Sequence, residues 1–242
     1  MNYCGKIIKV GSKDEVSIKA IKVRLNTLLG SKLDVQNGNF GTSTESVVKQ
    51  FQKKAQLIQD GMIGELTWER LFTESTEVKP HSNLLRFRAL EIADTQLFVR
   101  EKTGKNDGVD VEGYLKTVGL GKGYAWCMAF VYWLFLKAAT DLKVTNPVPK
   151  TAGVLDCYAK AKKLGYVIDK KDVQPGDQGI MDFGGGKGHT FIVTELKGDT
   201  HVYTVEGNTS ADPTYAGEDR EGNGVFERNR SIASIKAFIR YE

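Results

Sequence analysis

The sequence predicts an α+β protein in which a small three-helix unit precedes a larger mixed domain. Residues 15–73 carry apolar side chains at helical spacing, whereas the C-terminal third carries short alternating or apolar runs separated by glycine turns. Helices in the first part of a domain followed by strands in the last part are typical of α+β folds. The 242 residues suffice for one large or two small domains.

A repeated turn motif marks the first unit, residues 15–73. The segments NGNFGTST (37–44) and DGMIGELT (60–67) share the pattern Asn/Asp-Gly-x-x-Gly-x-x-Thr. Each glycine pair suits a tight turn, and each threonine lies near the start of a helix. The pattern predicts a helix between the two turns, capped by Ser43 or Thr44, with one helix before it and a short one after it.

Residues 74–83 are the expected linker, because this stretch has no apolar periodicity and contains a proline. The second domain is expected to cover 84–242. It begins with a helix, continues through a polar loop at 101–110 and a second helix, and ends in strands. The strands are predicted at residues 178–183, 189–196, 201–207, 224–229 and 234–242.

The charge and cysteine content exclude several classes of protein. The net charge of +4 is mild and no long Lys/Arg run occurs, so nucleic acid is not an expected partner. Three cysteines without a Cys-x-x-Cys pair argue against a disulfide framework and against a structural zinc site. Of these, Cys4 and Cys157 receive no role.

No segment predicts export or membrane insertion. The first residues lack the apolar core and the cleavage site of a signal peptide. The longest apolar run, Ala125–Leu136, is shorter than the ~20 residues that a membrane-spanning helix needs. We therefore expect a protein made in the cytoplasm without its own export signal, and a monomer.

Cys127 stands between a glycine-rich approach, GLGKGYAW (119–126), and a long apolar helix. This places it in the first helical turn, where backbone amides stabilise a thiolate and a buried helix provides a rigid mount. Free cysteines are also common as packing residues in protein cores. The stretch alone leaves both interpretations open.

His189 is the histidine that best suits a nucleophilic cysteine, which needs a base. If Gly198–Asp199 is a two-residue hairpin loop, His189 lies opposite Asn208 and shares one sheet face with Glu206 and Asn208. Carboxylate or amide neighbours can fix the tautomer of an imidazole. The alternative is a surface hairpin whose polar residues lie on its solvent-exposed face. A shift of one residue in the strand pairing would place these side chains on different faces.

Metal binding is the weaker alternative, and we expect no metal and no cofactor. His189, Glu206 and Asn208 could contribute ligands, but the chain has no His-Glu-x-x-His motif. Acidic residues of the 101–110 loop could bind calcium, but they do not match the EF-hand pattern. A solvated acidic loop is the simpler interpretation.

At these residues the sequence resembles the cysteine, histidine-dependent amidohydrolase/peptidase (CHAP) family. The resemblance spans about residues 88–240 and rests on GYAWCMAFVYW, GHTFIV and VEGNT in family order, preceded by PGDQGIMDF. It implies a papain-like α+β fold and cleavage of peptidoglycan. It further implies Cys127 as nucleophile, His189 as base and Glu206 as the residue that orients His189, with Asn208 at a fourth polar position.

The first unit resembles the small peptidoglycan-binding domain found beside cell-wall hydrolases. NGNFGTST, VVKQFQ and DGMIGELTW keep the spacing of that family's motifs over about residues 18–72, with Asn37 where aspartate is usual. Both resemblances imply bacterial peptidoglycan as the partner.

The implied function is an N-acetylmuramoyl-L-alanine amidase or a peptidoglycan endopeptidase. The alternatives are an NlpC-type cysteine endopeptidase and a catalytically inactive cell-wall-binding protein. The expected lack of an export signal suits an endolysin that a separate membrane-permeabilising protein releases to the wall. Unaided secretion in the absence of phage lysis genes would contradict that route.

Overall fold

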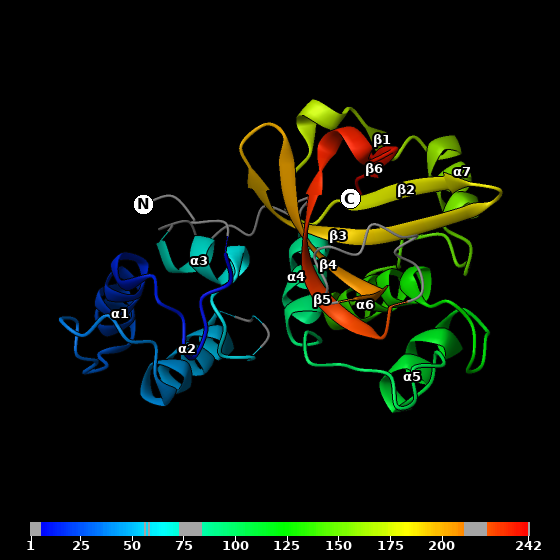
Figure 1. Cartoon of the computed structure of the whole chain (residues 1–242). Coiled ribbons are helices and arrows are strands. Elements are labelled where there is room, and N and C mark those ends of the chain that lie inside the picture. Colours follow the sequence, from blue (N-terminus) through cyan, green and yellow to red (C-terminus); the bar gives the residue numbers. More distant parts are fainter. Residues whose placement is uncertain (1–5, 56, 58, 73–83, 211–221, 242) are drawn as a thin grey trace. The chain divides into compact units, whose positions relative to one another are not determined.

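The computed structural model describes residues 6–55, 57, 59–72, 84–210 and 222–241 (Figure 1). Its contacts divide the chain into two compact units, Met1–His81 and Ser82–Glu242. The first unit is helical and the second combines helices with one sheet, so the predicted α+β class is confirmed. The expected linker, 74–83, and Cys4 lie outside the described residues.

Three helices build the first unit: α1 (Glu15–Leu29), α2 (Thr42–Lys54) and α3 (Glu65–Phe72). Asp14 caps α1, because its Oδ1 accepts a hydrogen bond from the Ser17 amide at 3.1 Å. The predicted cap of α2 at Ser43 or Thr44 is wrong. The helix starts earlier, with Gly41 as its N-cap and no side-chain cap hydrogen bond.

The second of the two repeated turns is held by the buried side chain of Gln52 on α2. Its Nε2 donates to Asp60 Oδ1 at 2.7 Å and to the Met62 carbonyl at 2.9 Å, and its Oε1 accepts from the Gly61 amide at 2.8 Å. A further hydrogen bond, 3.2 Å long, reaches Thr67 Oγ1 at the start of α3. One amide therefore joins α2, the turn and α3.

The second unit contains four described helices and one six-stranded sheet. The helices are α4 (Leu84–Asp94), α5 (Val109–Thr117), α6 (Cys127–Leu142) and α7 (Val154–Lys163). The strands are β1 (Val167–Ile168), β2 (Gln178–Gly184), β3 (Lys187–Lys197), β4 (His201–Thr209), β5 (Gly224–Ser231) and β6 (Ala237–Ile239). Short 3₁₀ turns, η1 (Lys170–Asp172) and η2 (Ile232–Ser234), complete the unit.

The strands lie in the order β1-β6-β2-β3-β4-β5, and every described pair is antiparallel. The predicted strand at 234–242 is too long, because η2 occupies its first residue and pairing begins only at Ala237. α6 contacts β3 and β4, as Figure 1 shows. β3 and β4 therefore lie between β2 and β5 and against the apolar helix.

The two faces of the sheet pack into separate clusters. Residues such as Ile192 and Val205 pack with the helices, whereas Phe191 and Val193 pack on the opposite face. This is the alternation expected of strands buried on both faces.

Within the described part of the chain, no helix is both long and apolar enough to cross a bilayer.

A buried ion-pair cluster fixes α4 to the sheet. The Asp177 carboxylate accepts hydrogen bonds from Arg86 Nη1 at 2.9 Å and from Arg240 Nη2 at 2.8 Å. Gly176, with φ of +88°, allows close approach because a Cβ there would lie 2.6 Å from the Arg86 Cβ. The Pro-Gly-Asp segment before β2 therefore joins α4 to Arg240, the residue that follows the last strand.

Replacing Gln52 with leucine tests the turn of the first unit. We expect Gln52→Leu to lower the free energy of unfolding by about 1–3 kcal/mol, since the Gly61 amide loses its buried acceptor. Hydrogen exchange over 15–72 in the full chain measures the effect. Lys53→Ala, an exposed change on the same helix, is the control. Equal protection in both variants would contradict the role of Gln52.

Candidate active site

Cys127 is the first residue of α6, as the sequence predicts, and its side chain is almost completely buried. Trp126 is the N-cap, and its carbonyl accepts the Phe130 amide at 2.8 Å. The first amides of a helix have no intrahelical acceptor, and they carry partial positive charge. The thiol therefore lies at a helix end that favours a nearby anion.

The acidic loop at 101–110 positions the segment before Cys127. Glu101 Oε1 accepts a hydrogen bond from the buried Trp126 indole at 2.8 Å, and Glu101 Oε2 accepts one from the Asn106 amide at 2.9 Å. The Asn106 carbonyl in turn accepts the Gly123 amide at 2.8 Å. The loop is thus tied to the N-cap of the cysteine helix.

Among the described residues, no three His, Cys, Asp or Glu side chains are grouped to hold a metal ion.

His189 and Glu206 form a fully buried pair on neighbouring strands. His189 Nε2 lies 2.8 Å from Glu206 Oε2, and the exposed fraction of both side chains is 0%. His189 comes from β3 and Glu206 from β4, so a contact between adjacent strands joins them. The family resemblance implied Glu206 as the residue that orients His189, and the structure places the Glu206 carboxylate in contact with the ring.

The predicted hairpin loop between β3 and β4 is wrong by one residue. Lys197 pairs with His201, so the loop is Gly198–Thr200 instead of Gly198–Asp199. An irregularity between Val193 and Glu195 shifts the pairing back by one, and Ile192 then pairs with Val205. This is the offset that the shorter loop predicted, so the pairing of Ile192 agrees with the prediction because the two deviations cancel.

Gly207 lets β4 approach the first turn of α6. A Cβ at this position would lie 2.6 Å from the Trp126 ring and 2.8 Å from the Phe130 ring. Real Cβ atoms do not tolerate such contacts, so a glycine is needed for this approach. Because Gly207 follows Glu206 directly, it brings the carboxylate strand against the helix that carries Cys127.

The Glu206 carboxylate receives hydrogen bonds from three side chains. Arg230 on β5 donates to it twice, from Nε to Oε1 at 2.8 Å and from Nη2 to Oε2 at 2.6 Å. Thr204 Oγ1 donates to Oε1 at 2.6 Å, and His189 completes the set at Oε2. Neither Arg230 nor Gly207 was identified from the sequence, because the Arg230 contact depends on the pairing of β4 with β5 and the Gly207 contact depends on the approach of β4 to α6.

These contacts shift both titrations in the direction of an ion pair. Burial raises the pKa of Glu206, but the hydrogen bonds from Arg230 and His189 outweigh burial and hold that pKa well below its usual range. Burial lowers the pKa of His189, but its contacts with Cys127 and Glu206 outweigh burial and raise the pKa to about 9. At neutral pH the pair is therefore an imidazolium beside a carboxylate.

The thiol of Cys127 lies beside the His189 ring. With Nε2 taken by Glu206, Nδ1 is the nitrogen available to the thiol. Nδ1 is buried and makes no hydrogen bond of standard geometry to the described residues, yet the Cys127 side chain is close enough to raise the His189 pKa. The thiol is therefore a neighbour of the ring.

Asn208, the fourth predicted site residue, is buried near the end of β4. Its φ of 60° is in the left-handed region, and it lies where the pairing of β4 with β5 is irregular. Asparagine tolerates this conformation better than most residues. Such backbone geometry is enriched at functional sites.

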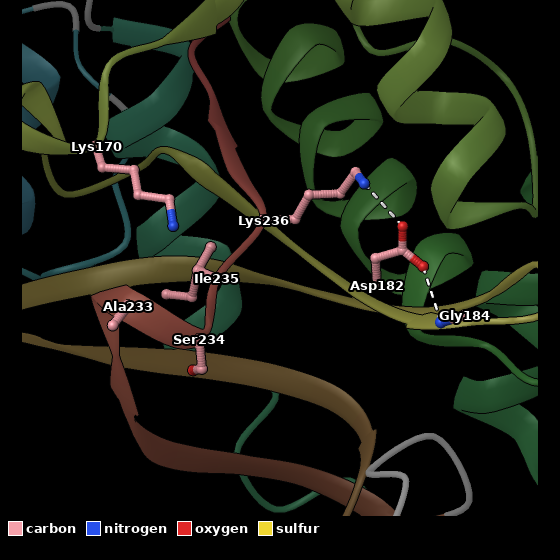
Figure 2. Close-up of a pocket in the computed structure, with 7 residues that line it drawn as sticks. All are labelled: Lys170, Asp182, Gly184, Ala233, Ser234, Ile235 and Lys236. Carbon is pink, nitrogen blue, oxygen red and sulfur yellow. Dashed lines mark hydrogen bonds and ion pairs between the residues drawn. The ribbon is translucent and has the colours of Figure 1, made fainter.

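A separate pocket lies near the ends of β2 and β6 (Figure 2). Lys236 Nζ pairs with Asp182 Oδ2 at 2.8 Å, and Asp182 Oδ1 accepts the Gly184 amide at 3.0 Å. The lining residues are Lys170, Asp182, Gly184, Ala233, Ser234, Ile235 and Lys236. None of the predicted site residues is among them.

Comparison with protein families finds one family for each of the two units. The peptidoglycan binding domain family matches residues 14–71, and the CHAP domain family matches residues 119–208. The chain is a CHAP-domain protein with an N-terminal peptidoglycan-binding domain. No curated protein and no solved structure gives a significant match.

The CHAP match ends at Asn208 and contains Cys127, His189 and Glu206. CHAP domains indicate a cell-wall amidohydrolase or peptidase, and the first unit supports peptidoglycan as the partner. Arg230 lies beyond the matched residues. The buried cluster of this CHAP protein therefore extends onto a strand outside the family match.

Substitution of Gly207 tests the close approach of β4 to α6. We expect Gly207→Ala to lower the free energy of unfolding by about 1–3 kcal/mol, because the added methyl group overlaps the Trp126 and Phe130 rings. Urea unfolding of the full chain measures this.

The matched control is Gly113→Ala in α5, where an added Cβ meets nothing within 4 Å. This control is expected to be neutral or to stabilise by up to ~1 kcal/mol, because alanine favours helices. A loss as large in Gly113→Ala as in Gly207→Ala would refute the packing argument.

Proposed function

We propose that the chain hydrolyses an amide bond in the peptide part of peptidoglycan by a thiol mechanism using Cys127, His189 and Glu206. The observation that supports this most directly is the position of His189, which is buried between the Cys127 thiol and the Glu206 carboxylate. A thiol beside an oriented imidazole at a helix N-terminus is the arrangement that nucleophilic cysteine chemistry needs.

In the first half of the reaction, the Cys127 thiolate attacks the amide carbonyl carbon and a C–S bond forms. The Cys127 backbone N–H is a candidate donor to the resulting oxyanion. His189 then gives its proton to the amide nitrogen, the C–N bond breaks and the amine leaves. A thioester remains on Cys127.

In the second half, His189 takes a proton from water and the hydroxide oxygen attacks the thioester carbonyl. The C–S bond breaks, the acid product leaves, and the thiolate beside the imidazolium is restored. Glu206 remains ionised throughout and holds the ring by its hydrogen bond to Nε2. We propose Asn208 as an additional polar member of the site.

The peptidoglycan-binding unit is proposed to hold the enzyme on its insoluble substrate. Attachment of one unit to the wall raises the local concentration of the other, since both belong to one chain. Release to the wall by a phage-type permeabilising protein stays a prediction.

Digestion of purified peptidoglycan, followed by mass spectrometry of the soluble fragments, tests the mechanism. We expect Cys127→Ala to lower the rate of fragment release by about 10⁴-fold or more, because the nucleophile is lost. Stem peptides freed from sugar would identify an amidase. Glycans that keep shortened or uncrosslinked stems would identify an endopeptidase.

The matched control is Cys157→Ala, which removes the second buried free thiol among the described residues. The Cys157 thiol contacts Tyr241 and Gln178 in the core, so activity is expected to persist. Co-sedimentation with peptidoglycan should be the same for both variants. Equal fragment release by Cys127→Ala and the wild type would rule out the thiol mechanism, and no release by any of the proteins would leave only a wall-binding protein.

A further inference from the structure

We propose that Arg230 is a positioning residue of the site, which holds Glu206 ionised and in one orientation and thereby sustains the Cys127 thiolate beside a protonated His189. The inference rests on the proposed function and extends it to a strand, β5, that contributes none of the reacting groups. It assigns to the site a residue beyond the segment matched by the CHAP family.

The geometry of the contact carries the proposal. Two nitrogens of the Arg230 guanidinium reach the two oxygens of one carboxylate, at 2.8 Å and 2.6 Å. A bidentate pair of this kind fixes the plane of the carboxylate as well as its distance. Because Oε2 also contacts His189 Nε2, a fixed carboxylate plane fixes the direction from which the imidazole is held.

The charges of the cluster explain why a cation is needed there. In the reactive state the thiolate and the Glu206 carboxylate each carry −1, and His189 and Arg230 each carry +1. This set is neutral, which suits a site where His189 and Glu206 are fully buried. Without Arg230 the same state has an uncompensated negative charge, so protonation of the thiolate or of Glu206 becomes more favourable.

Within the described part of the chain, the groups that face this cluster come from four elements. Cys127 lies on α6, His189 on β3 and Arg230 on β5, while the Thr204 hydroxyl on β4 donates to Glu206 without carrying charge. Arg228 lies two residues before Arg230 on the same strand and donates to the Ser210 carbonyl. Arg228 is therefore a suitable control, because it is a cation on the same strand that donates to a backbone oxygen.

The pH dependence of Cys127 alkylation by iodoacetamide tests the role of Arg230. Mass spectrometry of the Cys127 peptide from the full-length protein reports the rate without any need for hydrolysis. The rate rises with pH as the thiolate forms. We expect Arg230→Met to move the midpoint of this rise to higher pH and to slow alkylation by about tenfold or more at about pH 6.

Two further variants separate positioning from general support of the fold. Arg230→Lys keeps the charge without the bidentate geometry and should place the midpoint between those of the wild type and Arg230→Met. Arg228→Met should leave the midpoint unchanged. Circular dichroism checks folding, and if Arg230→Met does not fold, Arg230→Lys alone decides the question.

An unchanged midpoint in Arg230→Lys, or an equal shift in Arg228→Met, would overturn the proposal. Lower thermal stability of the Arg230 variants with an unchanged midpoint would show a merely structural role and overturn it as well. If the midpoint shifts in Arg230→Met while the wild-type protein releases no peptidoglycan fragments, the role of Arg230 is supported and the proposed hydrolysis is rejected. The two failures are therefore distinguishable.

Discussion

The hydrogen bond between His189 and Glu206 is the interaction on which the rest of the second unit depends. A buried carboxylate is costly unless donors surround it, and Glu206 receives donors from β3, β4 and β5. These three strands must therefore pair in one register for the site to exist. Gly207 allows the first turn of α6 to pack against β4 beside Glu206, and Cys127 is the first residue of that helix.

The two units differ in how they are built and in the function that each one supports. The first is a small helical domain whose turn is held by one buried amide, Gln52, and its family assignment supports peptidoglycan as the partner. The second combines an apolar helix with an antiparallel sheet, and rigid elements of this kind can keep the proposed nucleophile and its base aligned. Binding and the proposed chemistry are thus divided between domains of one chain.

The sequence predicted the α+β class, the helix at Cys127 and the neighbourhood of His189 and Glu206, because helical spacing, alternation and family motifs are local signals. The pairing of β3 with β4 came from an incorrect loop, and an irregularity after Val193 restored the offset. The contact between Arg230 and Glu206 joins positions 24 residues apart and follows from the pairing of β4 with β5. No periodicity or motif encodes that pairing, so Arg230 could not be identified before the fold was known.

The protonation state of His189 tests this account most directly. Its imidazole nitrogens can be followed by ¹⁵N NMR while the pH of the full-length protein is raised. We predict an imidazolium at neutral pH that loses its proton near pH 9, because contacts with Cys127 and Glu206 favour the charged ring. A neutral ring at pH 7, titrating near the ordinary histidine value of about 6.5, would contradict the buried ion pair from which the mechanism follows.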